Sequence, residues 1–342
     1  MTIKRPILAI TMGDPAGIGP EIAVKTFSVK EIYNRCSPLL IGNSEIIRQI
    51  LKITRHDLKI RTIYQVSEAK FEYGTIDIYE LPVENPEEIK YGKISKIAGD
   101  IAFRSVVKAI ELATRGEVDG TVTCPINKKA LNEAGHHFSG HTEIYAHYTN
   151  TPKYAMLLAD DKIKVIHVST HVSLRQACDL VKKDRILDVI SIMDKGLRKL
   201  GIDAPRIGVA GLNPHSGDDG LFGDEEINEI TPAVNEAKKL GFNVQGPVPP
   251  DTLFALANGG RFDGCVAMYH DQGHIPFKFS GFEWDEKKSV MKSVKGVNIT
   301  LGLPIVRTSV DHGTAFEIAG KGVASPDALL CAIDYAVKLC SN

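Results

Sequence analysis

The sequence predicts an α/β protein with a mostly parallel sheet, because short apolar runs alternate with amphipathic helical patterns along most of its 342 residues. At 43% hydrophobic residues, the chain is long and apolar enough for a large core or two domains. Two apolar arms flank an Asp-Asp turn in LLADDKIKVIHVST (157–170), which indicates a hairpin and hence some antiparallel sheet. Since no internal repeat, low-complexity tract or Pro/Ser-rich linker interrupts the pattern, we expect two domains to be interleaved in sequence.

The expected elements follow one another as strand–helix pairs. The pairs, each given as strand then helix, are 5–13 and 19–27, 37–43 and 44–54, 119–126 and 127–135, and 206–214 and 225–241. Longer amphipathic helices are expected at 99–116 and 184–200, and a last one at about 326–340, where Pro-Asp opens the helix.

Charge and cysteine usage exclude several classes of protein. Lys+Arg number 41 against 42 Asp+Glu, a formal net charge of −1, so no basic excess points to nucleic acid. No apolar run approaches the roughly 18 residues of a membrane span, and ILAITM (7–12) is better explained as a buried strand than as a signal peptide. The six cysteines are scattered without a C-x-x-C, which suits reduced thiols. We therefore expect a cytoplasmic protein that binds neither nucleic acid nor membrane.

The stretch MYHDQGHIPF (268–277) places His270 and His274 four residues apart, the spacing of helical H-E-x-x-H zinc sites. Gly273 and Pro276 work against a regular helix there, and no Glu follows the first histidine. The preceding DGCVAMY is a buried-strand pattern, so His270 and Asp271 are expected at the carboxyl end of a strand, and the H-E-x-x-H interpretation fails.

Two further histidines follow strand-like runs, His171 in VIHVSTHVSLR and His215 in IGVAGLNPHSGD. Together with His270 they could converge on one divalent metal and leave positions open for a substrate. Three unrelated loop histidines with local hydrogen bonds would give the same pattern, and spacing alone leaves the choice open.

The segment GDPAGIGPEI (13–22) contains Gly17 and Gly19, but Ile22 stands where a dinucleotide fingerprint needs its third glycine. It is consistent with a tight strand-to-helix turn with Pro20 near the first helical position. Backbone amides at the start of the helix could also face an anion.

Taken together, a set of sequence blocks resembles the 4-hydroxythreonine-4-phosphate dehydrogenase family over nearly the whole chain and in order. The blocks are GDPAGIGPEI (13–22), GHTE (140–143), GLNPH (211–215), PPDTLF (249–254), AMYHDQG (267–273), VNITLGLPIVRTS (297–309) and DHGTAFEIAGKG (311–322). Two of them are also similar to isocitrate and isopropylmalate dehydrogenases, which bind NAD(P) without the dinucleotide fingerprint.

The resemblance implies two α/β domains of the isocitrate/isopropylmalate-dehydrogenase type, with the active site in the interdomain cleft and shared across a homodimer. We expect a first, cofactor-side domain over 1–128 with 308–342, and a second domain over 129–307 that carries metal, substrate and dimer contacts. His171, His215 and His270 match the metal ligands of the family, with His270 supplied by the partner subunit. The ion would be Zn, Mg, Mn or Co.

The implied reaction is the NAD- or NADP-dependent oxidation of the C3 hydroxyl of a 4-phosphorylated threonine-like acid, followed by decarboxylation. The residues that match substrate contacts are His141, Thr142, Lys278, Asn298 and Arg307. Those that match the cofactor loop are His312, Gly313, Thr314 and Ala315. Those expected to orient a ligand or transfer protons are Asp251, Asp271 and Lys128. For Lys128, a solvated lysine on the following helix remains the alternative. Cations and amides suit a phosphate dianion, and the cofactor loop shows no obvious Arg for a 2′-phosphate, which favours NAD.

Two departures from the family pattern bear on the substrate. Residues 283–295 insert a charged loop containing the only Trp, expected to be either a surface excursion or a lid or dimer-contact loop. His274 replaces an aliphatic residue of the biosynthetic enzymes, which favours the branch acting on 4-phospho-D-threonate or 4-phospho-D-erythronate over the vitamin B6 branch acting on 4-phosphooxy-L-threonine. His274 and His167 themselves are expected to be structural. A metal-dependent phosphatase or lyase acting on a small phosphorylated acid is the alternative function.

Overall fold

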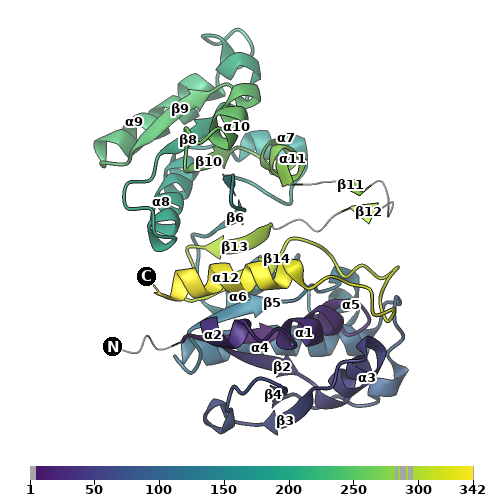
Figure 1. Ribbon diagram of the computed structural model, residues 1–342. Coiled ribbons are helices and arrows are strands. Elements are labelled where there is room, and N and C mark those ends of the chain that lie inside the picture. The colour runs from purple at the N-terminus through teal and green to yellow at the C-terminus, as the bar shows by residue number, and fades with distance from the viewer. Residues whose placement is uncertain (1–4, 282–283, 286–289, 292–295, 342) are drawn as a thin grey trace. The chain divides into compact units, whose positions relative to one another are not determined.

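The structure, a computed structural model, describes residues 5–281, 284–285, 290–291 and 296–341. The chain divides into two compact units (Figure 1). Unit 1 comprises Met1–Pro152 with Leu303–Ser341, and unit 2 comprises Lys153–Gly302. The α/β class expected from the sequence is confirmed, and unit 1 is built from both ends of the chain.

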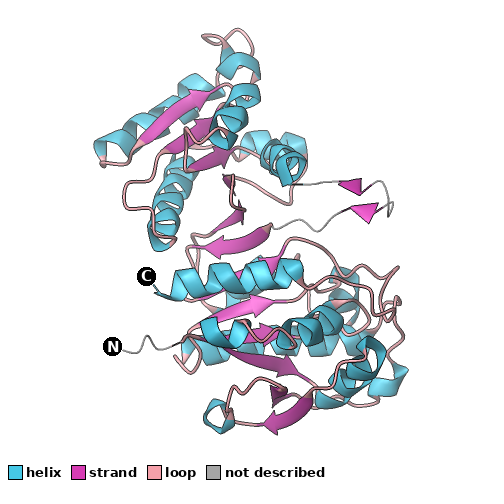
Figure 2. Ribbon diagram, in the orientation of Figure 1, coloured by secondary structure: helices cyan, strands magenta, loops and turns pink. Residues whose placement is uncertain are grey.

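Unit 1 contains a parallel sheet in the order β3-β4-β2-β1-β5-β14 (Figure 2). Its strands are β1 (Ile7–Thr11), β2 (Ser37–Gly42), β3 (Lys59–Ile63), β4 (Thr75–Glu80), β5 (Gly120–Thr123) and β14 (Val306–Val310). Central strands such as β2 are buried throughout, as expected for a parallel sheet with helices on its faces. Thr11 pairs with Thr123, and Thr123 with Ser309, so the loops after β1, β5 and β14 leave the same edge of the sheet.

Two groups of helices pack on this sheet. One group is α1 (Gly19–Phe27), α2 (Ile32–Arg35), α3 (Ser44–Thr54) and α12 (Asp327–Ser341); the other is α4 (Lys96–Thr114), α5 (Lys128–Glu133) and α6 (His141–Tyr148). Short 3-10 turns lie at η1 (Val66–Glu68) and η2 (Pro86–Glu88).

The unit boundaries differ from those expected, because α5, α6 and residues 303–307 lie in unit 1. The reason is a core cluster in which Leu131 of α5 and Ile144 and Tyr145 of α6 pack against Phe103 and Ile110 of α4. Because these side chains are buried together, residues 129–152 pack with α4 in unit 1. The strand and helix pattern of the sequence does not reveal such a contact between distant residues.

Unit 2 contains a mixed sheet in the order β13-β6-β7-β10-β8-β9. Its strands are β6 (Ala155–Ala159), β7 (Lys164–His167), β8 (Ile207–Ala210), β9 (Val244–Val248), β10 (Gly264–Ala267) and β13 (Val297–Leu301). Strand β6 is antiparallel to both β7 and β13, which confirms the predicted hairpin around the Asp-Asp turn. Strands β7, β10, β8 and β9 are parallel to one another.

The helices of unit 2 also form two groups. One is α8 (Lys183–Lys199), α9 (Thr231–Lys239) and a π-helical turn, η4 (Glu226–Ile230); the other is α10 (Pro250–Asn258) and α11 (His270–Gly281). Helix α7 (Leu174–Asp179) and the 3-10 turn η3 (Pro214–Gly217) lie in the loops after β7 and β8.

The predicted insertion at 283–295 contains a small antiparallel ribbon, in which β11 (Trp284–Asp285) pairs with β12 (Val290–Met291). Its other residues lie outside the described part of the chain, so the lid or dimer-contact role stays a prediction. All six cysteines are free thiols, as expected. Within the described residues, no helix has both the length and the apolarity that crossing a membrane would require.

Candidate functional site

The three histidines predicted to bind a metal lie in loops that start at the same edge of the unit 2 sheet. Ala267 of β10 pairs with His167 of β7, and Val266 pairs with Val209 of β8, so these three parallel strands end side by side. His171, His215 and His270 follow the ends of β7, β8 and β10 within a few residues. The carboxyl edge of a parallel sheet is where α/β proteins place their chemistry.

His171 and His270 come together in this chain, with ring centroids 5.9 Å apart. They line a 490 Å³ cavity with Asp271 and Tyr269. His270 Nδ1 lies 2.6 Å from Asp271 Oδ1, and this hydrogen bond lowers the pKa of Asp271. An ionised carboxylate only accepts, so Nδ1 carries the proton and Nε2 presents its lone pair. This carboxylate–histidine arrangement is the one that orients metal-binding imidazoles.

The third predicted ligand, His215, lies in η3 and packs near Phe222, with ring centroids 6.4 Å apart. Within the described residues, no three His, Cys, Asp or Glu side chains gather into a group able to hold a metal ion. A complete trio in one chain is not expected where one ligand comes from a partner subunit, so the shared metal site stays a prediction.

Residues 270–281 form helix α11, so the expectation that Gly273 and Pro276 prevent a helix was wrong. Tertiary packing explains the outcome: a Cβ atom on Gly273 would lie 2.5 Å from His167 Nε2, so only glycine lets the helix approach β7 this closely. The rings of His270 and His274 stack at 3.6 Å with an interplanar angle of 11°. Lone pairs of parallel stacked rings do not converge on one ion, which excludes the H-E-x-x-H interpretation despite the helix.

His274 donates from Nδ1 to the carbonyl of His270 at 2.9 Å, and burial lowers its pKa to about 4. His167 is buried, contacts Met156 O through Nδ1 at 3.2 Å, and has its pKa lowered to about 3 by burial. Both are therefore neutral imidazoles built into the packing of α11 on β7.

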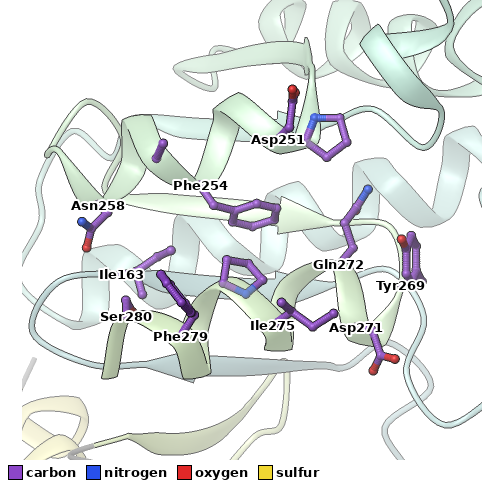
Figure 3. Close-up of a pocket in the computed structure, with 13 residues that line it drawn as sticks. Ile163, Asp251, Phe254, Asn258, Tyr269, Asp271, Gln272, Ile275, Phe279 and Ser280 are labelled. Atoms are coloured by element: carbon purple, nitrogen blue, oxygen red, sulfur yellow. The ribbon is translucent and has the colours of Figure 1, made fainter. Parts of the chain in front are cut away.

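Asp251 lies in the first turn of α10 and lines a 570 Å³ cavity together with Asp271 (Figure 3). The close-up shows the two carboxylates pointing away from each other, so they do not form an acid pair within one chain. Phe254, Ile275 and Phe279 supply apolar surface to the same cavity.

Unit 1 brings His141 close to Arg307, and Thr142 follows His141 at the start of α6. Arg307 is 3% exposed, donates to Thr123 Oγ1 at 2.9 Å, and lies 5.6 Å from the ring centre of Tyr145. Burial lowers the pKa of Arg307 to about 10, so the guanidinium remains charged at neutral pH.

His141 begins α6, and its Nε2 is buried without a hydrogen-bond partner in the described residues. Burial is the main reason that the pKa of His141 lies well below its usual range, and the positive charges of Arg307 and Lys128 lower it further. The ring is therefore neutral beside two cations. A buried guanidinium and a nearby lysine, with an unsatisfied polar atom beside a helix N-terminus, are an arrangement suited to an anion.

Lys128 is the first residue of α5 and is exposed, after Asn127, whose side chain accepts the backbone N–H of Ala130 and caps the helix. A Cβ on Gly140 would lie 3.8 Å from Lys128 Cε, which places the lysine at the start of α6. Lys128 is thus exposed to solvent and close to the start of α6, and its proton-transfer role stays a prediction.

Two predicted substrate residues lie in unit 2. Lys278 is in α11, and Asn298 is in β13 opposite Leu158. Asn298 Oδ1 is buried and has no hydrogen-bond partner among the described residues. Buried polar atoms in native proteins are normally satisfied, so an unsatisfied oxygen here is consistent with a missing ligand.

The predicted cofactor loop, His312–Ala315, follows β14 and packs on the Gly-rich turn after β1. The amide of Ile18 donates to Thr314 O at 3.0 Å, and a Cβ on Gly17 would lie 2.8 Å from the same residue. The amide of Ile18 therefore donates to the loop and is not available to an anion, contrary to one expectation for the start of this helix. Glycine at 17 is required because the loop approaches so closely.

A buried ion pair, Glu21 with Lys25, holds the segment that follows this loop, and the sequence did not predict it. Glu21 accepts the amides of Gly322 at 3.2 Å and Ala324 at 2.6 Å, and Lys25 donates to the carbonyls of the same two residues. The only sequence signal was the i, i+4 spacing of Glu21 and Lys25, which is common on solvated helices.

Comparisons with known proteins agree with this architecture. The family model described as "Pyridoxal phosphate biosynthetic protein PdxA" matches residues 34–336. A protein of Pectobacterium atrosepticum named "D-threonate 4-phosphate dehydrogenase" is 46% identical over 97% of this chain and 99% of its own length.

Solved structures are also similar. The 4-hydroxythreonine-4-phosphate dehydrogenase of Klebsiella pneumoniae is 43% identical with a TM-score of 0.85, covering 98% of this chain and 99% of that one. A terephthalate 1,2-cis-dihydrodiol dehydrogenase of Burkholderia xenovorans is 28% identical with a TM-score of 0.67, covering 98% of both chains.

Proposed function

Because the chain belongs to the family of pyridoxal phosphate biosynthetic protein PdxA, we propose that it is an NAD-dependent, divalent-metal-dependent dehydrogenase of a 4-phosphorylated threonine-like acid. The proposed reaction oxidises the C3 hydroxyl, after which the β-keto acid loses its carboxyl group as CO2. Of the candidate substrates we favour 4-phospho-D-threonate, since the Pectobacterium relative is named for that substrate. A vitamin B6 precursor, 4-phosphooxy-L-threonine, is the competing substrate, because the Klebsiella relative is named for it.

The observation that carries the proposal is the set of buried polar groups left for a small substrate that bears both an anion and hydroxyls. Arg307 is a buried cation, and His141 Nε2 and Asn298 Oδ1 are buried atoms without partners in the described residues. We assign the phosphate to Arg307, His141 and Thr142 of unit 1, because charge-assisted hydrogen bonds to a dianion compensate for burying the cation. Lys278 of unit 2 stays a predicted substrate contact. Asn298 is assigned to a hydroxyl of the substrate, which can donate to its buried oxygen.

We assign a divalent ion to His171 and His215 together with His270 of the partner subunit, and NAD to the loop His312–Ala315. The donor set fits a metal, because Asp271 fixes the proton of His270 on Nδ1 and leaves Nε2 as a ligand atom. When bound, the ion supplies Lewis acidity at the C3 hydroxyl and NAD accepts the hydride.

Chain residues then handle the protons. Oxidation releases the hydroxyl proton, which needs a nearby base, and decarboxylation later needs a proton donor at the enolate carbon. Lys128 is a candidate for either role, since it lies at the start of α6 beside His141. Asp251 is the other candidate, and Asp271 acts through the imidazole that it orients.

We also propose a homodimer that shares its active sites. Among the described residues the proposed ligands do not gather within one chain, and α11, which begins at His270, exposes large apolar side chains. Phe279 is 88% exposed and Ile275 is 66% exposed, which is costly in water and favours burial against a second copy. Light scattering should give the mass of a dimer, and Phe279→Glu should shift it toward monomer with a parallel loss of activity.

Rates of NADH formation test the function. Metal-loaded enzyme with NAD is offered 4-phospho-D-threonate, 4-phospho-D-erythronate and 4-phosphooxy-L-threonine in turn. Preference for either of the first two places the enzyme in sugar-acid catabolism, and preference for the third in vitamin B6 synthesis. Phosphate release without NADH would refute a dehydrogenase and favour the phosphatase alternative.

A further inference from the structure

The loop that carries His215 has an unusual backbone. Six consecutive residues, 215–220, have positive φ, with values of 52° at His215, 56° at Ser216, 45° at Asp218 and 55° at Asp219. Only two of the six are glycines, and each left-handed non-glycine residue costs roughly 1 kcal/mol or more. Such a run persists only where the surrounding structure fixes it.

A buried carboxylate lies at the start of this run. Glu226, 3% exposed, opens the π-helical turn η4 and accepts the amides of Leu212 at 2.7 Å and Asn213 at 2.8 Å through Oε1. Its Oε2 accepts the side-chain amide of Asn213 at 2.9 Å. A Cβ on Gly217 would lie 2.8 Å from the same Oε2, so the left-handed loop closes directly around this carboxylate. π-Helical turns are frequent at functional sites.

A second buried side chain connects this loop to the start of α11. Gln272 donates from Nε2 to Gly211 O at 2.8 Å and accepts the amide of Met268 at 2.6 Å. Met268 O in turn accepts Ser169 Oγ at 3.0 Å, two residues before His171. Side-chain hydrogen bonds to backbone therefore join the three loops that bear His171, His215 and His270.

We propose that Glu226 and Gln272 are positioning residues that fix the loops bearing His171 and His215 for metal binding, together with the start of the helix that presents His270 to the ion of the partner subunit. The inference rests on the metal role proposed for these histidines, but the mechanical part of it concerns the chain alone. Both side chains are buried, and both bond backbone groups just before the left-handed run, Glu226 at Leu212 and Asn213 and Gln272 at Gly211. Changing them should loosen the loops first and weaken the metal site as a consequence.

Hydrogen exchange of metal-free protein tests the mechanical part. In Glu226→Gln one acceptor oxygen becomes a donor that faces the Asn213 amide group, and the charge is lost. We expect the amides of Leu212 and Asn213 to exchange about tenfold faster or more, since a hydrogen bond to a charged group contributes about 1.5–3 kcal/mol. Glu229→Gln is the matched control: Glu229 lies in the same turn but accepts the amide of Lys183 at 2.7 Å, so exchange at 212–213 should not change.

Wild-type exchange rates at 212–213 in Glu226→Gln would overturn the inference. If that variant does not fold, Gln272→Glu provides the same test, because it keeps the acceptor for Met268 and sets a carboxylate against the carbonyl of Gly211. There the amide of Met268 should stay protected while the metal affinity falls. Unchanged affinity in that variant would also overturn the inference.

Titration of the metal-free chain with Co²⁺ or Zn²⁺ tests the consequence. We expect the dissociation constant to rise about 10–100-fold in Glu226→Gln, as for other residues that orient metal ligands, and excess metal to restore turnover. Glu229→Gln should bind as wild type. His215→Ala separates the two proposals: wild-type affinity in that variant would refute the metal role of His215, while the exchange rates would still decide the positioning role of Glu226.

Discussion

Replacing Arg307 by Met should weaken substrate binding without destabilising the free protein. The pKa of Arg307 falls from its usual range to about 10, chiefly because burial removes water from the guanidinium. One pKa unit corresponds to about 1.4 kcal/mol, so burying the charged form costs roughly 3 kcal/mol. The cost is fully present below pH about 10 and disappears only as pH rises toward 12.5.

Arg307→Met removes this cost and loses the hydrogen bond to Thr123 Oγ1, which contributes about 1–2 kcal/mol. The free energy of unfolding should therefore stay level or rise by about 1–2 kcal/mol, which thermal melting without ligand can measure. A phosphate dianion loses a charge-assisted, bidentate partner, so kcat/KM should fall about 100-fold or more, largely through KM. Stabilisation of the protein by added inorganic phosphate should decrease in parallel.

Arg185→Met is the matched control. Arg185 donates to the carbonyls of Val168 and Tyr154, both at 3.0 Å, and its role is structural. This variant should melt at a lower temperature while its KM for the phosphorylated substrate stays near the wild-type value. If Arg307→Met instead loses several degrees and keeps its KM, Arg307 is a structural residue and the assignment of the phosphate site is wrong.

Three further predictions concern Asp14, Gly273 and Asp271. Burial raises the pKa of Asp14 from 3.8 to about 6, so ionisation of this carboxyl destabilises the folded protein as pH rises. The unfolding free energy of Asp14→Asn should therefore exceed that of the wild type by about 3 kcal/mol at pH ~8 but by only about 1 kcal/mol at pH ~4.5. A difference that does not change with pH would contradict this prediction. Gly273→Ala should lose about 1–3 kcal/mol in urea unfolding, because the new Cβ would meet His167 Nε2 at 2.5 Å; stability at or above wild type would refute the close approach of α11. Asp271→Asn should raise the metal dissociation constant about tenfold, since its hydrogen bond orients His270, and unchanged affinity in a metal titration would rule out that role.

Much of the fold could be predicted from local sequence. The alternation of apolar strands with amphipathic helices gave the α/β class, and the two apolar arms around Asp160-Asp161 gave the antiparallel β6–β7 hairpin. These features depend on neighbours within a few residues, which a single sequence displays. The carboxyl-end positions of His171, His215 and His270 were predictable for the same reason.

Other features were decided by contacts between distant residues. Helix α11 forms although Gly273 and Pro276 disfavour it, because packing on β7 outweighs local propensity and needs glycine at the contact. Helices α5 and α6 join unit 1 because they share a core with α4.

The sequence by itself determined which residue types stand at the strand ends, and therefore the chemistry available there. Only the tertiary structure decided which of them meet. Gln272 and Glu226 look like ordinary polar residues of a helix and a loop, yet folding buries both against backbone groups 13–61 positions away in the chain. Burial makes those hydrogen bonds obligatory, because an unsatisfied polar group has no water to replace its partner, and local sequence does not reveal which groups will be buried together.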